Sequence, residues 1–253
     1  MLQIQQFRNK IRTHGLPQTL RYTADFLSAP LRRKLWTEPV LKSYSQKGED
    51  LIIDQMLGHR KNGRYLDIGA YDPQILSNTK RFYDRGWRGC NIEPNPSRFE
   101  KFLRDRPGDI NLNLGLSSSA GNLTFYDFVP ETYATFSEIR AQELQAAGAK
   151  LQQEMIVPVI TMIDLFEQHL GGTPVDFCTL DTEGLDLIVL KSNDWNKFRP
   201  RVFCVEVSLT QSHPEGDLAT ESIEEFLIAV GYQKQSETVQ FGVPLNGIYL
   251  DQK

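Results

Sequence analysis

Short apolar runs alternate with amphipathic stretches along the chain after residue 43. Such runs are typical of buried parallel strands, and the stretches between them have helical spacing. The predicted strands lie at residues 65–68, 87–93, 110–116, 122–128 (exposed), 175–180 and 201–207. After the last predicted helix, residues 223–230, two runs at 239–243 and 247–250 predict a terminal antiparallel pair. This order predicts an α/β fold with a doubly wound, mostly parallel sheet.

The stretch from Pro130 to Met155 interrupts the alternation. A loop with Tyr133 and Thr135 comes first, and a polar run with helical character follows from Ser137 to Glu154. We interpret residues 130–156 as an insertion into a domain that spans residues 43–253. An insertion of this length beside a binding site is expected to form its wall or lid.

The first 42 residues differ from the rest in charge. They hold eight Lys or Arg and two Asp or Glu, a balance of +6, whereas the remainder carries −10. Leu2, Ile4, Phe7 and Ile11 recur at helical intervals, so residues 1–42 are predicted to form a basic helical arm. Such an arm can lie on an anionic membrane surface as a peripheral contact, join two subunits in an oligomer, or pack on the domain. The acidic balance of the domain disfavours a nucleic-acid partner.

Composition is that of an ordinary globular protein, with 40% hydrophobic and 24% charged residues. No apolar run approaches the roughly 18 residues that a membrane span needs, and the N-terminus lacks the apolar core of a signal peptide. A cytoplasmic location is therefore expected. The three cysteines, Cys90, Cys178 and Cys204, lie in apolar runs without the spacing of metal ligands, so we expect buried thiols.

Three predicted strands end at an acidic residue. Asp67 precedes the turn at Gly69, Glu93 follows the second strand, and Asp181 follows the strand at 175–180. The carboxyl ends of parallel strands meet at one edge of a doubly wound sheet, in the crevice where nucleoside-type ligands bind. We therefore expect the three carboxylates to converge there.

The turn after the first strand lacks the glycine pattern of a dinucleotide site. Only Gly69 stands where a pyrophosphate would need G-x-G-x-x-G. S-adenosylmethionine carries no phosphate, and its ammonium, sulfonium and ribose hydroxyls suit acidic side chains. A nucleoside-cofactor oxidoreductase or epimerase is thus a weaker alternative, and a non-catalytic binding protein of the same fold is another.

Seven ordered blocks resemble the FkbM family of S-adenosylmethionine-dependent methyltransferases. They are Tyr44–Asp50, Leu66–Ala70, Ser77–Thr79, Gly86–Gly89, Ile92–Pro96, Asp181–Gly184 and Val205–Glu206. The resemblance implies a Rossmann-like class I methyltransferase fold and an enzyme of the general class EC 2.1.1. It also implies that the acceptor is a hydroxyl on a sugar, a glycan or a similar small molecule.

The same resemblance implies cofactor contacts along the sheet edge. The blocks place Asp67, Gly69 and Ala70 at the methionine part and Glu93 on the ribose hydroxyls. Asn78 falls in a block as well, although Ser-Asn-Thr also caps helices without a ligand. By position alone, Leu116 and Ser117 correspond to the adenine contact.

The resemblance further places Asp181 and Glu183 against the methyl group and the acceptor. Because a sulfonium is an excellent leaving group, the protein must chiefly align the acceptor oxygen and remove its proton. Asp181, Glu183, Glu206 or His213 is expected to take that proton. The first three could also gather a magnesium ion, but no spacing requires a metal and none is assigned. Asp186 stands where the family commonly has Glu, a departure expected to matter little.

Overall fold

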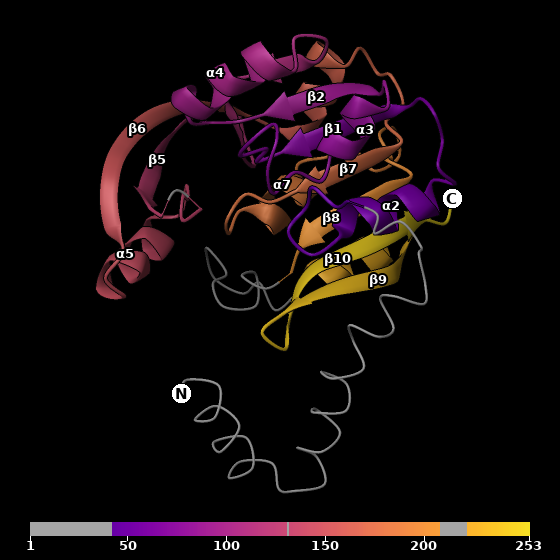
Figure 1. Ribbon diagram of the computed structural model, residues 1–253. Coiled ribbons are helices and arrows are strands. Elements are labelled where there is room, and N and C mark those ends of the chain that lie inside the picture. The colour runs from indigo at the N-terminus through magenta and orange to yellow at the C-terminus, as the bar shows by residue number, and fades with distance from the viewer. Residues whose placement is uncertain (1–41, 131, 208–221) are drawn as a thin grey trace, which may run out of the picture. The chain divides into compact units, whose positions relative to one another are not determined.

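Seven strands form the main sheet of the computed structural model, which describes residues 42–130, 132–207 and 222–253. They are β1 (Arg64–Ile68), β2 (Arg88–Ile92), β3 (Ile110–Leu112), β7 (Phe177–Leu180), β8 (Val202–Glu206), β9 (Tyr232–Gln240) and β10 (Val243–Asp251). Their order is β3-β2-β1-β7-β8-β10-β9. Figure 1 shows this order from β2 to β9. The first five are parallel, whereas β10 runs antiparallel to both β8 and β9. The predicted α/β fold with a doubly wound, mostly parallel sheet and a terminal antiparallel pair is confirmed.

Helices cover both faces of this sheet because successive strand residues point to opposite sides. Leu66 and Ile68 pack on one face with α6 (Met162–Asp164), the π-helical turn η1 (Leu165–His169), α7 (Asp186–Lys191) and α8 (Ile223–Ala229). Tyr65 packs on the other face with α2 (Glu49–Met56) and α3 (Lys80–Asp84). Cys90, Cys178 and Cys204 are buried free thiols, as predicted.

The predicted strand at 110–116 is divided between two sheets. Residues after β3 leave the main sheet, and β4 (Gly115–Leu116) joins a smaller one. Asn113 lies at the break, where its side-chain amide donates to the carbonyl oxygens of Glu93 and Pro94, both at 2.9 Å. These bonds turn the chain away from β2, so the single predicted strand was wrong.

The smaller sheet has the order β4-β6-β5, with β5 (Gly121–Val129) antiparallel to β6 (Lys150–Ile160). Between them lies α5 (Glu138–Ala146), which accounts for only the first part of the predicted helical run. The rest was wrong, because Gly148 has a φ of 91° and reverses the chain into β6. The strand prediction for β5 is confirmed, but it is half buried through Phe125 and Phe128 rather than exposed.

The terminal strands are longer than predicted, and they turn at a different place. The hairpin reverses at Phe241 and Gly242, with φ values of 53° and 85°, rather than at 244–246. Two successive positive φ values match the twist of antiparallel strands. The sequence signal was misread because phenylalanine is an uncommon residue for such a turn.

Two predictions fall partly or wholly outside the described residues: the arm at 1–42 and His213. Within the described part of the chain, no helix has the length and apolarity needed to cross a bilayer.

Candidate active site

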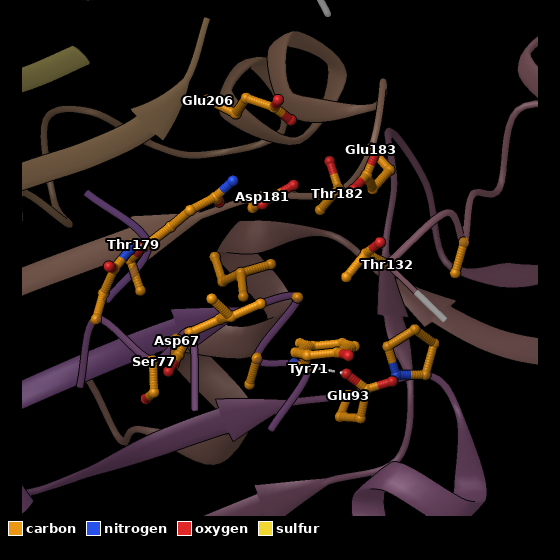
Figure 2. A pocket seen from close by; sticks show the side chains of 18 of the residues that line it. Asp67, Tyr71, Ser77, Glu93, Thr132, Thr179, Asp181, Thr182, Glu183 and Glu206 are labelled. Carbon is orange, nitrogen blue, oxygen red and sulfur yellow. Dashed lines mark hydrogen bonds between the residues drawn. The ribbon is translucent and has the colours of Figure 1, made fainter. Parts of the chain in front are cut away.

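A cavity of about 470 Å³ lies beyond the carboxyl ends of the central strands. It is located where the sheet order reverses, between β1 and β7, which is the place where doubly wound sheets bind ligands. Asp67, Glu93 and Asp181 all line it, so the expected convergence of the three acids is confirmed. Figure 2 shows Asp67 and Glu93 on one side of the cavity and Asp181, Glu183 and Glu206 on the other.

The turn after β1 uses its backbone amides internally. Gly69 N and Ala70 N both donate to the carbonyl oxygen of Ile92 at 3.0 Å, and Tyr71 N donates to Glu93 Oε2 at 2.8 Å. Consecutive amides that face a ligand are what a bound phosphate needs. This turn therefore offers no phosphate cradle, in agreement with the missing glycine pattern.

Gly69 is required for a second reason. Its φ is 77°, and a Cβ built on it would lie 1.7 Å from the carbonyl oxygen of Asp181. The lack of a side chain at Gly69 thus lets the backbone at the end of β7 approach the turn closely. This contact brings the turn after β1 directly against the acidic turn after β7.

Asp67 is buried at the floor of the cavity. Thr79 donates its hydroxyl to Asp67 Oδ2 at 2.6 Å. Burial raises the pKa of Asp67 to about 6, although the Thr79 hydrogen bond and the charge of Arg106 oppose the shift. The carboxylate is therefore fixed in position and ionised near neutral pH.

Arg106 is fully buried behind this carboxylate, and sequence reasoning missed it. Its Nη1 donates to Thr79 Oγ1 at 2.6 Å, while Nη2 donates to Pro73 O at 2.7 Å and to Ser77 Oγ at 2.9 Å. One guanidinium thus fastens the loop between β1 and α3 from below. A basic residue at the end of α4 (Pro96–Asp105) gave no sequence signal, because such residues are common at helix C-termini.

The Glu93 carboxylate is held by two backbone amides. Tyr71 N donates to Oε2 and Asn95 N donates to Oε1, each at 2.8 Å. Burial raises the pKa of Glu93 to about 7, while the charge of Arg98 and the two amides oppose the rise. Each carboxylate oxygen keeps a further lone pair that can accept from a ligand hydroxyl.

Asp181, Glu183 and Glu206 form an acidic cluster, with one oxygen of each within 4.8 Å of the others. Part of Asp181 is reached by solvent. The surrounding protein nevertheless displaces much of its water and, together with the negative charge of Asp186, raises the pKa of Asp181 to about 7. The pKa of Glu183 is raised well above its usual range by burial and by the neighbouring acids. Carboxylates this close can share protons or hold a cation.

Asp186 organises the turn that carries this cluster. Its carboxylate accepts from Thr182 N at 2.9 Å and from Gly184 N at 3.3 Å. Within this turn, Glu183 has a φ of 53° and Gly184 has a φ of 114°. The residue noted as a departure from the family pattern is thus fully buried and structurally important. Its place at the start of α7 was the available signal.

Residues of the insertion form a further wall of the cavity. Thr132, Tyr133, Phe136 and Arg140 line the cavity. Thr135 does not line it, but its hydroxyl donates to the carbonyl oxygen of Glu183 at 2.8 Å. The insertion is thereby connected to the acidic turn.

Four carboxamide side chains lie along the rest of the cavity edge. Asn78 donates to Thr179 Oγ1 at 2.8 Å, Gln46 donates to Gln240 Oε1 at 2.8 Å, and Asn246 donates to Glu49 Oε1 at 2.9 Å. Asn78, Gln46, Gln240 and Asn246 all line the cavity. Each side chain has both donor and acceptor groups, so each keeps capacity for a polar ligand.

Leu116 and Ser117 do not line the cavity. Both are buried at β4, and Ser117 N donates to Ile160 O at 3.0 Å within the smaller sheet. Their assignment to adenine stays a prediction. His213 lies outside the described residues, and its role is likewise untested.

Two solved structures of methyltransferases are similar to this chain. A methyltransferase FkbM from Methylobacillus flagellatus KT is similar at 13% identity and a TM-score of 0.47, over 85% of this chain and 46% of its own. The chain thus spans less than half the length of that protein. A TehB-like SAM-dependent methyltransferase from Corynebacterium glutamicum is similar at 11% identity and a TM-score of 0.44, over 92% of this chain and 99% of its own.

No curated protein matches the sequence. The profile described as the methyltransferase FkbM domain matches residues 67–234, a region that holds all three strand-end acids. Since this region is more than half of the chain, the protein belongs to the FkbM family of methyltransferases.

Proposed function

We propose that this protein uses S-adenosylmethionine to methylate a hydroxyl group of a sugar, a glycan or a similar polyhydroxylated molecule. One observation carries the proposal: a cavity at the β1/β7 reversal presents fixed carboxylates while the turn beside it presents no phosphate cradle. A nucleoside cofactor without phosphate fits these hydrogen-bond acceptors. A dinucleotide does not, which disfavours an oxidoreductase or an epimerase.

The cofactor residues follow from the chemistry of each end of the ligand. Glu93, held by two amides, would accept hydrogen bonds from both ribose hydroxyls. Asp67, Gly69, Ala70 and Asp181 surround the place proposed for the amino-acid end, where a carboxylate can pair with the ammonium. When bound, the cofactor supplies an activated methyl group on a sulfonium.

Support for a polyhydroxylated acceptor comes from the rim. Carboxamides both donate and accept, as neighbouring sugar hydroxyls do, and the rim holds four of them. Tyr133 of the insertion adds an aromatic ring on which an apolar sugar face can pack. The acidic cluster lies between this rim and the proposed cofactor residues.

Within the cluster, Asp181 is the proposed general base. Its raised pKa brings it close to neutrality, where a base combines sufficient ionisation with a useful affinity for the proton. Glu183 and Glu206 would then align the acceptor hydroxyl. His213 stays a candidate for the same proton, outside the described residues.

Calorimetric titration with S-adenosylmethionine tests cofactor binding directly. We expect saturable heat and a higher unfolding temperature in the wild type. Glu93→Gln should bind at least about tenfold more weakly, because one of its side-chain groups becomes a donor that opposes a backbone amide. Glu100→Gln, an exposed change on neighbouring α4, should bind as the wild type does.

A second measurement separates binding from catalysis. The full chain is incubated with methyl-labelled cofactor and a panel of glycans and polyols, and label transfer is followed by mass spectrometry. A large loss of transfer in Asp181→Asn, measured at a cofactor concentration that saturates the variant, would support the enzyme. Cofactor binding with no transfer to any acceptor in the panel would favour the non-catalytic alternative, and no binding at all would refute the proposal.

A further inference from the structure

The tip of the β9–β10 hairpin exposes apolar side chains to solvent. Phe241 is 97% exposed and Val243 is 56% exposed. A phenylalanine in this state keeps nearly all of its apolar surface in water, which is unfavourable unless something covers it. The positive φ values at Phe241 and Gly242 form a tight turn, so the ring is displayed on a defined structure.

This tip is part of the cavity mouth. Gln240, next to Phe241, lines the cavity and accepts a hydrogen bond from Gln46 at 2.8 Å. Leu245 and Asn246 on the following strand also line it. The exposed ring therefore lies close to the opening of the proposed active site.

Two other segments at the mouth expose apolar side chains as well. Ile75 and Leu76, in the loop fastened by Arg106, are 59% and 45% exposed. Tyr133, in the insertion, is 44% exposed. Leu76 and Tyr133 line the cavity themselves. We define the apolar rim as the exposed apolar residues of these two segments and of the hairpin tip: Ile75, Leu76, Tyr133, Phe241 and Val243.

We propose that the apolar rim docks the protein on an anionic lipid bilayer, with the cavity mouth facing the lipid headgroups. A polar cavity bordered by separate apolar loop tips matches the layered chemistry of a bilayer surface. Ile75, Phe241 and Val243 reach the acyl boundary, while the cavity and the Tyr133 ring at its edge remain among headgroups.

Charge favours the same partner. Lys47 lies with its Nζ 6.0 Å from the centre of the Phe241 ring, which places a cation beside the apolar tip. Residues 1–42, with a balance of +6, join the domain at Ser43, three residues before Gln46. Basic segments next to apolar anchors bind anionic leaflets.

Vesicle flotation of the full chain tests the proposal without knowledge of the acceptor. Vesicles of phosphatidylcholine alone are compared with vesicles that also contain phosphatidylglycerol. The wild type should float with the anionic vesicles, and the double variant Phe241→Ser, Val243→Ser should partition about tenfold less. The matched control is Ile156→Ser, Ile228→Ser, which removes apolar side chains that are 71% and 54% exposed and do not line the cavity.

A spectroscopic variant reports insertion itself. Phe241→Trp should float as the wild type does. After subtraction of the wild-type emission from its three tryptophans, the added fluorescence should shift to the blue only when anionic vesicles are present. Several results would overturn the proposal: a wild type that floats with neither vesicle, equal flotation of the wild type and the rim variant, or an equal loss in the control. Concentration-dependent dimerisation that the rim variant abolishes, without vesicle binding, would identify a second copy as the partner instead.

Discussion

The carbonyl oxygen of Asp181 occupies the space where a side chain on Gly69 would begin, 1.7 Å from the built Cβ position. The contact joins the ends of β1 and β7, the two strands between which the sheet order reverses. It fixes the spacing between the proposed cofactor turn and the acidic turn. Glycine is needed here both for the close approach and for the φ of 77°.

Gly69→Ala should therefore be severely destabilising, by about 4 kcal/mol or more, because backbone atoms rather than a flexible side chain oppose the new methyl group. Gly121→Ala is the matched control, since a Cβ there meets nothing within 4 Å and no positive φ is involved. Chemical denaturation measures both. An alanine at position 69 with wild-type stability would contradict the observed contact.

Arg106→Met should lower stability by about 3 kcal/mol, because Thr79, Ser77 and the Pro73 carbonyl each lose a buried partner. The loop that carries Ser77 and Asn78 should loosen, so cofactor affinity should fall as well. Arg106→Lys keeps the charge but lacks the planar fork, and it should recover only part of either loss. Arg104→Met, at a side chain that is 70% exposed, should change neither quantity.

The acidic cluster predicts a rate that rises with pH. If Asp181 is the base, only its ionised form is active, so the rate should increase through about pH 7 and then level off. In Asp181→Asn, the residual rate should lack this limb. A wild-type profile that is flat between pH 6 and 8 would exclude Asp181 as the base; these limits follow from the usual window of about one pH unit on either side of a pKa.

The raised pKa values also make the stability of the fold decrease with pH, whereas the rate is expected to increase. A carboxyl whose pKa rises on folding binds its proton more tightly in the native state, so it stabilises the fold at low pH. Asp67, Glu93 and Asp181 all have raised pKa values. Their joint contribution should fall as pH increases from about 4 to about 7 and then remain constant. Denaturation midpoints measured across that range test the direction.

The three cysteines should be inert in the native protein. Each is buried, and burial raises the pKa of each thiol, which suppresses the reactive thiolate. Ellman's reagent should detect no fast thiol in the folded chain and all three in denaturant. A fast native thiol would mean that one of these strands opens readily.

Sequence reasoning located the acids of the site because each one ends an apolar run, and parallel strands bring such ends together. Arg106 was missed for the converse reason. Its partners lie about 30 residues earlier in the chain, and nothing local distinguishes a buried arginine from an exposed one before the fold is known.

Errors in secondary structure came from local cues that tertiary contacts override. Asn113 looks like part of an alternating strand until its amide meets two carbonyl groups of a neighbouring loop. The polar start of β6 looks helical, but its backbone pairs with β5, and only a partner strand makes that conformation favourable. The roles of Leu116, Ser117 and His213 stay predictions.

The hydrogen bond from Thr135 to the Glu183 carbonyl has a consequence for how acceptor choice can change. The smaller sheet and α5 supply one wall of the cavity, while Asp67, Glu93 and Asp181 belong to the main sheet and its loops. Sequence changes within the insertion can therefore reshape the proposed acceptor wall and leave these three carboxylates in place. In a chimera that receives another insertion, retention of this single threonine would preserve the alignment of the two halves.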